Sequence, residues 1–153
     1  MSERNPLPSA GRIRPLAPAD RAAWDRLWAG YLTFYDSGVA PEVTEATWTR
    51  LLDPAAPMFA LVAEDEAGVF GLAQCVLHAS TWSTTPYCYL NDLFVDPARR
   101  GGGAGRALIE AVQAEADARG AGRVYWMTHE TNAVARQLYD RVATRSGFIQ
   151  YQR

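Results

Sequence analysis

One stretch of the 153-residue chain, residues 87–110, constrains its fold more than any other. Residues 87–95 are almost continuously aromatic or branched apolar, which is typical of a strand covered on both faces. Asp96-Pro97 ends that strand, because proline has no N–H for a sheet ladder. Apolar residues at helical spacing then predict a helix from Gly105 to about Gly120. The order is therefore strand, glycine turn and helix.

The turn between this strand and helix is rich in glycine and arginine. Its residues are Arg100, Gly101, Gly102, Gly103, Ala104, Gly105 and Arg106. Glycine is costly to order and forms helices poorly, so folding alone gives little reason for this composition. A backbone without Cβ atoms can approach an anion closely, helix N-termini attract negative charge, and arginine matches phosphate. The turn is thus predicted to bind phosphate; the alternative is a flexible connection that merely tolerates glycine.

The spacing within the turn separates the kinds of phosphate ligand. A Walker loop needs Gly-Lys followed by Ser or Thr, and no lysine lies near the turn. A dinucleotide fingerprint needs a small residue where Arg106 stands and follows the first strand of its sheet. Arg-x-x-Gly-x-Gly, formed by Arg100, Gly103 and Gly105, instead resembles the acyl-CoA pyrophosphate loop of the GNAT superfamily of N-acetyltransferases.

A second motif, Asn-x-x-Ala-x-x-Leu-Tyr followed by Gly-Phe, begins at Asn132 and resembles the other half of the GNAT fold. The resemblance is close over residues 87–151, extends to residues 11–86 only in element order, and looks like the small-amine and histone/polyamine-type branch. It implies that acetyl-CoA is the co-substrate and that its pantetheine arm lies between two splayed central strands. The implied contacts of that arm are Leu93, Phe94, Val95, Asn132, Ala135 and Tyr139.

The expected fold class is α/β, with a GNAT-like central mixed sheet and helices on both faces. The N-terminal part of the sheet is expected to be antiparallel, and a helix crossing predicts a parallel central pair. Strands are predicted over residues 12–16, 58–63, 69–78, 87–95 and 123–128, with a further Gly-Phe strand within 146–151. Helices are predicted from residues 17–20 to about 35, and over 44–52, 105–120 and 133–142.

Composition sets broad limits on the chain. With 48% hydrophobic and 21% charged residues, residues 11–153 are expected to form a single domain after a loose tail at residues 1–10. A net charge of −2 predicts no attraction to nucleic acid or to an anionic membrane surface. Cys75 and Cys88 lie in apolar runs without metal-ligand spacing, which indicates buried, reduced thiols in a cytoplasmic protein that holds no metal.

Polar residues in and beside the central strands are the candidates for proton transfer. Asn91 and Asp92 interrupt an apolar strand, and burying either one unpaired costs about 1–3 kcal/mol. A site beside them explains both; the alternative is that one pairs with an arginine and the other caps a strand bulge. Asp92 is the first candidate for the general base, with Glu130 second. His129 is either a further base candidate or an exposed loop residue.

Two further assignments concern the acceptor and the leaving group. The first helix carries aromatic residues at helical spacing, and its far end, from Tyr31 through Tyr35 to Asp36, is either core or an aromatic wall for an amine cation. By the resemblance, Tyr139 protonates the departing thiolate, although its spacing also suits a core aromatic.

The sequence therefore predicts an acetyl-CoA-dependent N-acetyltransferase in which a primary amine attacks the thioester directly. The amine belongs to a small amine, a polyamine, an amino acid or a lysine side chain. A non-catalytic acyl-CoA sensor or partner subunit is the alternative, because many relatives in this branch appear to have glutamate where Asn91 stands. The final strand usual in the fold is absent or supplied by another chain, so a homodimer is expected.

Overall fold

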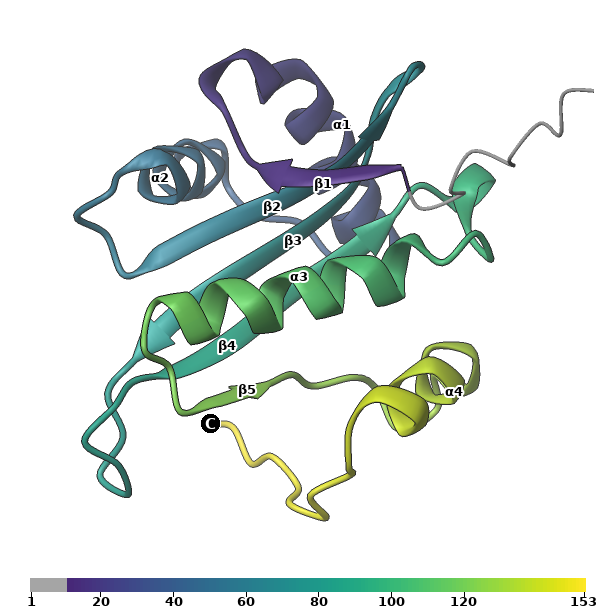
Figure 1. The fold of residues 1–153 in the computed structure, drawn as a ribbon. Coiled ribbons are helices and arrows are strands. Elements are labelled where there is room, and N and C mark those ends of the chain that lie inside the picture. The colour runs from purple at the N-terminus through teal and green to yellow at the C-terminus, as the bar shows by residue number, and fades with distance from the viewer. Residues whose placement is uncertain (1–10) are drawn as a thin grey trace, which may run out of the picture.

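The structure is a computed structural model that describes residues 11–153, and the loose tail expected at residues 1–10 lies outside them. A five-stranded sheet in the order β1-β2-β3-β4-β5 forms its centre (Figure 1). The strands are β1 (Arg12–Pro15), β2 (Met58–Asp65), β3 (Gly68–His78), β4 (Tyr87–Val95) and β5 (Arg123–Tyr125). Neighbours from β1 to β4 are antiparallel, whereas β4 and β5 are parallel. The expected mixed sheet is confirmed.

Helices cover both faces of the sheet, as expected. On one face lie α1 (Arg21–Phe34) and α2 (Pro41–Leu52), and on the other lies α3 (Ala104–Ala118) (Figure 1). α4 (Ala133–Val142) follows β5, and two short 3₁₀ helices, η1 (Pro18–Asp20) and η2 (Pro97–Arg99), precede α1 and α3.

Each face of the sheet has its own apolar core. Trp24 and Leu27 of α1 are buried against Leu72 and Phe94 of the sheet. Leu108, Ile109 and Val112 of α3 are buried against the other face, where Cys75, Cys88 and Leu90 lie. Both cysteines are free thiols with no exposed surface, as the apolar runs around them predict. The two cores hold β3 and β4 rigidly between helices, which fixes the position of polar groups on those strands.

The structure differs from the sequence-based expectation in three elements. α2 begins at Pro41 rather than at Thr44, since proline suits the first turn of a helix. β5 ends at Tyr125, three residues early, because only three of its residues pair with β4. The expected Gly-Phe strand within 146–151 is wrong: these residues have no regular structure and no neighbouring ladder to satisfy their backbone groups. Within residues 11–153, no helix is both long and apolar enough to span a bilayer.

A β-bulge in β4 determines which side chains face α1. Gln74 of β3 is paired with Asp92, but the next residue, Cys75, is paired with Leu90, so Asn91 is an extra residue without a partner. Asp92 therefore faces α1 together with Gln74, while Leu90 faces the α3 core. The alternative that one of the two polar residues occupies a strand bulge is correct for Asn91.

Candidate active site

The parallel pair β4 and β5 separates part of the way along. Three residue pairs join the strands, Tyr87–Arg123, Cys88–Val124 and Tyr89–Tyr125. Beyond Tyr125 the chain is no longer a strand, so β4 from Leu90 to Val95 has no ladder on that side. Backbone N–H and C=O groups along such an edge can pair with an extended ligand. Leu93, Phe94 and Val95 all lie on this unpaired half of β4.

The glycine turn lies just beyond the unpaired end of β4. Gly101 and Gly103 have φ values of 83° and 87°, which L side chains rarely adopt, and a Cβ atom at either position meets nothing within 4 Å. Backbone conformation rather than crowding therefore requires glycine, and the space before the turn is open. Gly103 is the N-cap of the 15-residue α3, whose first N–H groups have no intrahelical acceptors. The turn has the geometry of an anion site.

The arginines around the turn have different surroundings. Arg99 is in an ion pair with Asp65 and lies 4.0 Å above the Phe70 ring, so it joins the turn to the β2–β3 loop. Arg106 pairs with Glu110 one helical turn further on, at 3.0 Å, and both side chains are exposed. Neither ion pair is buried enough to hold its arginine against a doubly charged phosphate.

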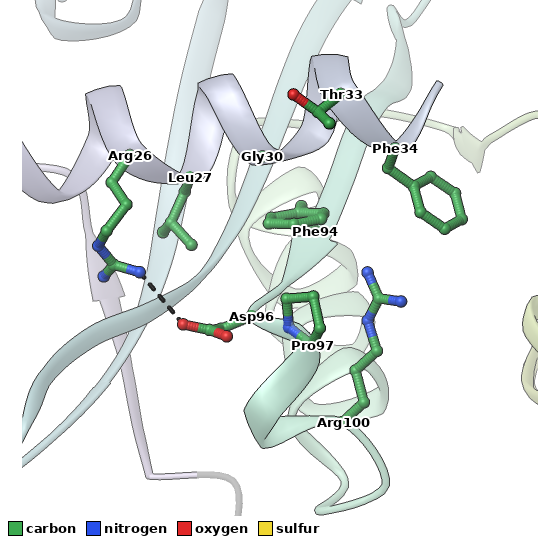
Figure 2. A pocket seen from close by; sticks show the side chains of 9 residues that line it. All are labelled: Arg26, Leu27, Gly30, Thr33, Phe34, Phe94, Asp96, Pro97 and Arg100. Atoms are coloured by element: carbon green, nitrogen blue, oxygen red, sulfur yellow. Dashed lines mark hydrogen bonds and ion pairs between the residues drawn. The ribbon is translucent and has the colours of Figure 1, made fainter. Parts of the chain in front are cut away.

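The Arg100 side chain points into a pocket between α1 and the end of β4 (Figure 2). Its Nε donates to the carbonyl oxygen of Val95 at 3.2 Å, and its guanidinium lies 5.2 and 5.5 Å from the ring centroids of Phe34 and Phe94. The pocket has a volume of about 420 Å³. It is lined by Arg26, Leu27, Gly30, Thr33, Phe34, Phe94, Asp96, Pro97 and Arg100. Arg26 is paired with Asp96 at 3.2 Å, so Arg100 supplies the unbalanced positive charge of a mostly apolar pocket. Such a pocket suits part of an anionic, partly apolar ligand.

Asp92 lies on the α1 side of β4, in a network of hydrogen-bond donors. Gln74 Nε2 donates to Asp92 Oδ2 at 2.8 Å, Asn91 Nδ2 donates to Oδ1 at 3.3 Å, and the Tyr31 hydroxyl also donates to this carboxylate. The Gln74 amide is fixed in turn because its Oε1 accepts from Trp24 Nε1 at 2.7 Å. The alternative in which the partner is an arginine is wrong for Asp92.

Burial and hydrogen bonding act in opposite directions on Asp92. Desolvation raises the pKa of Asp92 above its ordinary value and is the largest effect, while the bonds from Gln74, Tyr31 and Asn91 oppose it. The result is a carboxylate that holds a proton more readily than a surface aspartate does. Such a group can act as a general base.

Two tyrosines at the end of α1 lie near Asp92, and a third tyrosine, on α4, lies near Tyr35. Burial raises the pKa values of Tyr31 and Tyr35, and the Asp92 charge adds to the effect on both. Burial also raises the pKa of Tyr139 on α4, and Tyr35 is its second cause, so α1 and α4 approach each other here. The ring of Tyr139 meets the edge of Trp126 at 5.6 Å. Tyr139 is therefore half-buried beside the strand gap, with a phenol that stays protonated at neutral pH.

The other predicted site residues lie around the gap or outside it. Asn132 caps α4, since its Oδ1 accepts from Ala135 N at 3.3 Å, and its Nδ2 donates to Thr128 Oγ1 at 3.4 Å. Glu130 has a side chain that is 78% exposed and lies 3.5 Å from Arg145, outside the Asp92 network. Asp36 follows α1, exposed and with a φ of 49°.

Sequence reasoning missed two residues of the Asp92 network, Gln74 and Trp24. Gln74 is only 2% exposed and is one of two buried polar or charged residues in residues 11–153. The signal was present, because Gln74 is the one polar side chain in the apolar run from Val69 to Leu77. A buried amide in such a run needs partners, which indicates a functional or structural network.

Comparisons with known proteins agree with this geometry. The model of the Acetyltransferase (GNAT) family matches residues 22–143. The D-amino-acid N-acetyltransferase HPA3 of Saccharomyces cerevisiae is 36% identical over 143 residues, covering 92% of this chain and 89% of that protein. An aminoglycoside N(6')-acetyltransferase type 1 of Stenotrophomonas maltophilia is 34% identical over 111 residues, covering 71% of this chain and 69% of the relative.

Solved structures share the fold at low sequence identity. AAC(6')-Iy, in complex with the bisubstrate analogue CoA-S-monomethyl-acetylneamine, has a TM-score of 0.80 at 18% identity and covers 93% of this chain and 96% of its own. A ribosomal-protein-alanine N-acetyltransferase from Brucella melitensis biovar Abortus 2308 has a TM-score of 0.74 at 20% identity, covering 92% of this chain and 97% of its own. Because the family model spans residues 22–143 and the yeast relative is similar over nearly the full length, the expected family is confirmed: the chain belongs to the GNAT family of N-acetyltransferases.

Proposed function

We propose that this protein transfers an acetyl group from acetyl-CoA to a primary amine by direct attack of the amine on the thioester. The observation that carries the proposal is the gap between β4 and β5, which begins beyond the Tyr89–Tyr125 pair and follows the half of β4 that carries Asp92 toward the glycine turn. One extended ligand along the gap connects an anion site to a base and an acid. No metal takes part in this scheme.

The cofactor is held by the turn and the gap. The N-terminus of α3 and the arginines bind the pyrophosphate, and the pantetheine arm pairs with the free edge of β4. Arg100 lies within reach of this ligand if it leaves the ring of Phe34, which is 51% exposed. The proposed cofactor contacts are Leu93, Phe94, Val95, Arg100, Gly101, Gly102, Gly103, Ala104, Gly105, Arg106, Asn132, Ala135 and Tyr139.

The reaction removes two protons from the nitrogen, delivers one proton to the leaving sulfur and needs a site for the oxyanion. Asp92 removes a proton from the acceptor ammonium, directly or through water, and the neutral amine attacks the thioester carbonyl. The backbone N–H near Val95 stabilises the oxyanion of the tetrahedral intermediate. When the C–S bond breaks, Tyr139 gives its proton to the thiolate. The nitrogen of the tetrahedral intermediate still carries one extra proton, which leaves as the amide forms and reprotonates the Tyr139 phenolate through water. The amide product and free CoA then leave, and the first proton passes from Asp92 to solvent.

The acceptor lies between α1 and β4 in this proposal. Tyr31 and Tyr35 form an aromatic wall over Asp92, their rings 5.0 Å apart, and such a wall suits an amine cation. Asn91 and Asp36 lie at the edges of this space. The relatives named for D-amino acids and for aminoglycosides support a small-molecule amine, and the higher identity and coverage of HPA3 favour an amino acid.

Release of free thiol from acetyl-CoA tests the proposal. The protein is incubated with acetyl-CoA and with amino acids of both configurations, polyamines, aminoglycosides or lysine peptides, and thiol is measured over time. Turnover with amino acids is the expected result. Tight binding of acetyl-CoA with no turnover on the whole panel would instead favour a sensor or partner subunit.

The glycine turn gives a prediction about cofactor binding. Gly105→Val places a branched side chain over the first turn of α3, and its Cβ atom meets Leu138 at an ordinary 3.5 Å, so the fold accepts the change. We expect acetyl-CoA affinity to fall on the order of 100-fold as charge-assisted hydrogen bonds are lost. Calorimetry measures the loss, with Ala118→Val at the far end of α3 as control. Unchanged affinity in Gly105→Val refutes the pyrophosphate assignment.

We also propose that the protein is a cytoplasmic homodimer. Phe148, Ile149 and Tyr151 are 91%, 72% and 88% exposed, next to a β5 edge that is unpaired, and a second copy is a natural cover for both. The free thiols of Cys75 and Cys88 support a reducing compartment. Sedimentation at micromolar concentration is expected to give twice the monomer mass, and a monomer contradicts the assembly.

A further inference from the structure

The α1-facing side of the sheet continues past Asp92 as an aromatic surface. Because Asn91 is an extra residue, Asp92 and Tyr89 follow each other on this face, opposite Gln74 and Val76 of β3. Two neighbouring positions on one face of a strand are about 6.6 Å apart. The rings on this part of the face belong to Tyr87, Tyr89, Tyr125 and His78.

Tyr89 is held firmly from one side. Its ring stacks on Tyr125 with centroids 5.0 Å apart and planes 14° apart. Tyr125 is fixed in turn, because its hydroxyl lies 2.6 Å from His78 Nε2 and the two rings meet edge to face at 5.6 Å. Within residues 11–153 no other ring contacts Tyr89, so its second face has no aromatic partner. The Tyr89 side chain is partly exposed, so the arrangement is a preorganised platform that a ligand ring can reach.

The platform lies at the proposed reaction centre. Among the causes that raise the pKa of Tyr89, burial comes first, the Asp92 charge second and Tyr125 third, with Tyr35 also acting on it. Tyr35, 43% exposed at the end of α1, is close enough to both Asp92 and Tyr89 for their charges to interact. α1 packs against β3 and, through Gly30 and Tyr31, against Phe94 near the end of β4. The surface is half-buried and continuous with the acceptor site.

We propose that Tyr89, backed by Tyr125, binds an aromatic ring of the acceptor, so that the preferred substrates are arylalkylamines or aromatic amino acids. The inference rests on the proposed N-acetyltransferase activity and names its acceptor class. An acceptor nitrogen beside Asp92 and an acceptor ring on Tyr89 lie about two residues of strand apart. This distance suits a two-carbon linker between the ring and the nitrogen.

Matched acceptors test the proposal on the unmodified protein. The kcat/KM for phenylalanine is compared with that for cyclohexylalanine, and phenethylamine with hexylamine, by thiol release. Stacking predicts a preference on the order of tenfold for the aromatic member of each pair. Equal values within both pairs overturn the aromatic subsite and leave the acetyltransferase proposal intact. Absence of turnover on every amine of the wider panel removes the acetyltransferase proposal itself, so the two failures are distinguishable.

A variant separates ring binding from general support of the sheet. Tyr125→Leu removes the ring that backs Tyr89, and Tyr151→Leu makes the same chemical change at a side chain that is 88% exposed. We expect Tyr125→Leu to raise KM for phenethylamine about tenfold, with KM for hexylamine and kcat for both amines little changed. Tyr151→Leu is expected to change none of these values. An equal loss on both amines in Tyr125→Leu would show a structural role and overturn the proposal.

Discussion

Tyr139→Phe is expected to lower kcat by about 10²–10⁴-fold, because the departing thiolate loses its general acid. A CoA thiolate has a basicity similar to that of a cysteine thiolate and needs a proton to leave. Burial raises the pKa of Tyr139 above its ordinary value, so the phenol is fully protonated at neutral pH and can supply that proton. Phenylalanine keeps the ring and its edge contact with Trp126.

Affinity and stability measurements distinguish the acid from a packing residue. In Tyr139→Phe the acetyl-CoA Kd from calorimetry and the Tm are expected to stay near the wild-type values. Tyr151→Phe serves as control, since this hydroxyl lies on an exposed side chain outside the site. A near wild-type kcat in Tyr139→Phe removes this tyrosine from the mechanism.

Asp92→Asn is expected to lower kcat/KM by about 10²–10⁴-fold, because an amide cannot accept the acceptor's proton at neutral pH. The matched control is Glu130→Gln, whose carboxylate is 78% exposed and lies outside the Asp92 network, and it is expected to retain activity. The reverse result moves the base to Glu130. Equal and small effects in the two variants mean that the amine arrives already neutral.

The pH dependence provides a second measurement on Asp92. The wild-type rate is expected to rise as Asp92 ionises, at a pH above the ordinary aspartate value of 3.8, since burial raises its pKa. The contribution of Asp92 to folding stability changes with pH in the opposite direction to the rate. A folded-state pKa above the unfolded value means that the contribution to stability is present below the unfolded pKa and is lost as pH rises through the folded pKa. In Asp92→Asn this loss of stability with rising pH is expected to disappear. Free energies of unfolding from chemical denaturation at a series of pH values measure the difference from wild type.

The sequence predicted the elements that depend on short-range patterns. The strand Tyr87–Val95 is bounded by proline and formed mostly by apolar side chains. Gly101 and Gly103 before α3 have positive φ values, a local backbone conformation that favours glycine. Asn132 caps α4 through a bond to a residue three positions away. Each of these features is determined within a few residues of the chain.

Features that depend on distant partners were not predictable from the sequence. The bulge at Asn91 is a matter of register between β3 and β4, and the Gln74 amide is fixed by Trp24, fifty positions away. The length of β5 and the absence of a strand near Phe148 depend on whether a neighbouring strand is available for pairing. The pattern of apolar residues in the sequence does not show this. The site residues were therefore identified by type, while their mutual arrangement required the fold.

The short β4–β5 ladder divides the molecule into parts of unequal local stability. No side chain in residues 117–153 is buried, whereas β2, β3 and α3 supply most of the two cores. Local opening free energies are lowest where buried contact is scarce, so the C-terminal segment opens more readily than the rest. A ligand that pairs with β4 and also touches α4 adds its binding free energy to the closed form alone. In the complex proposed above, the cofactor takes the place of a neighbouring strand, and its free concentration determines the fraction of molecules in which the C-terminal segment is open.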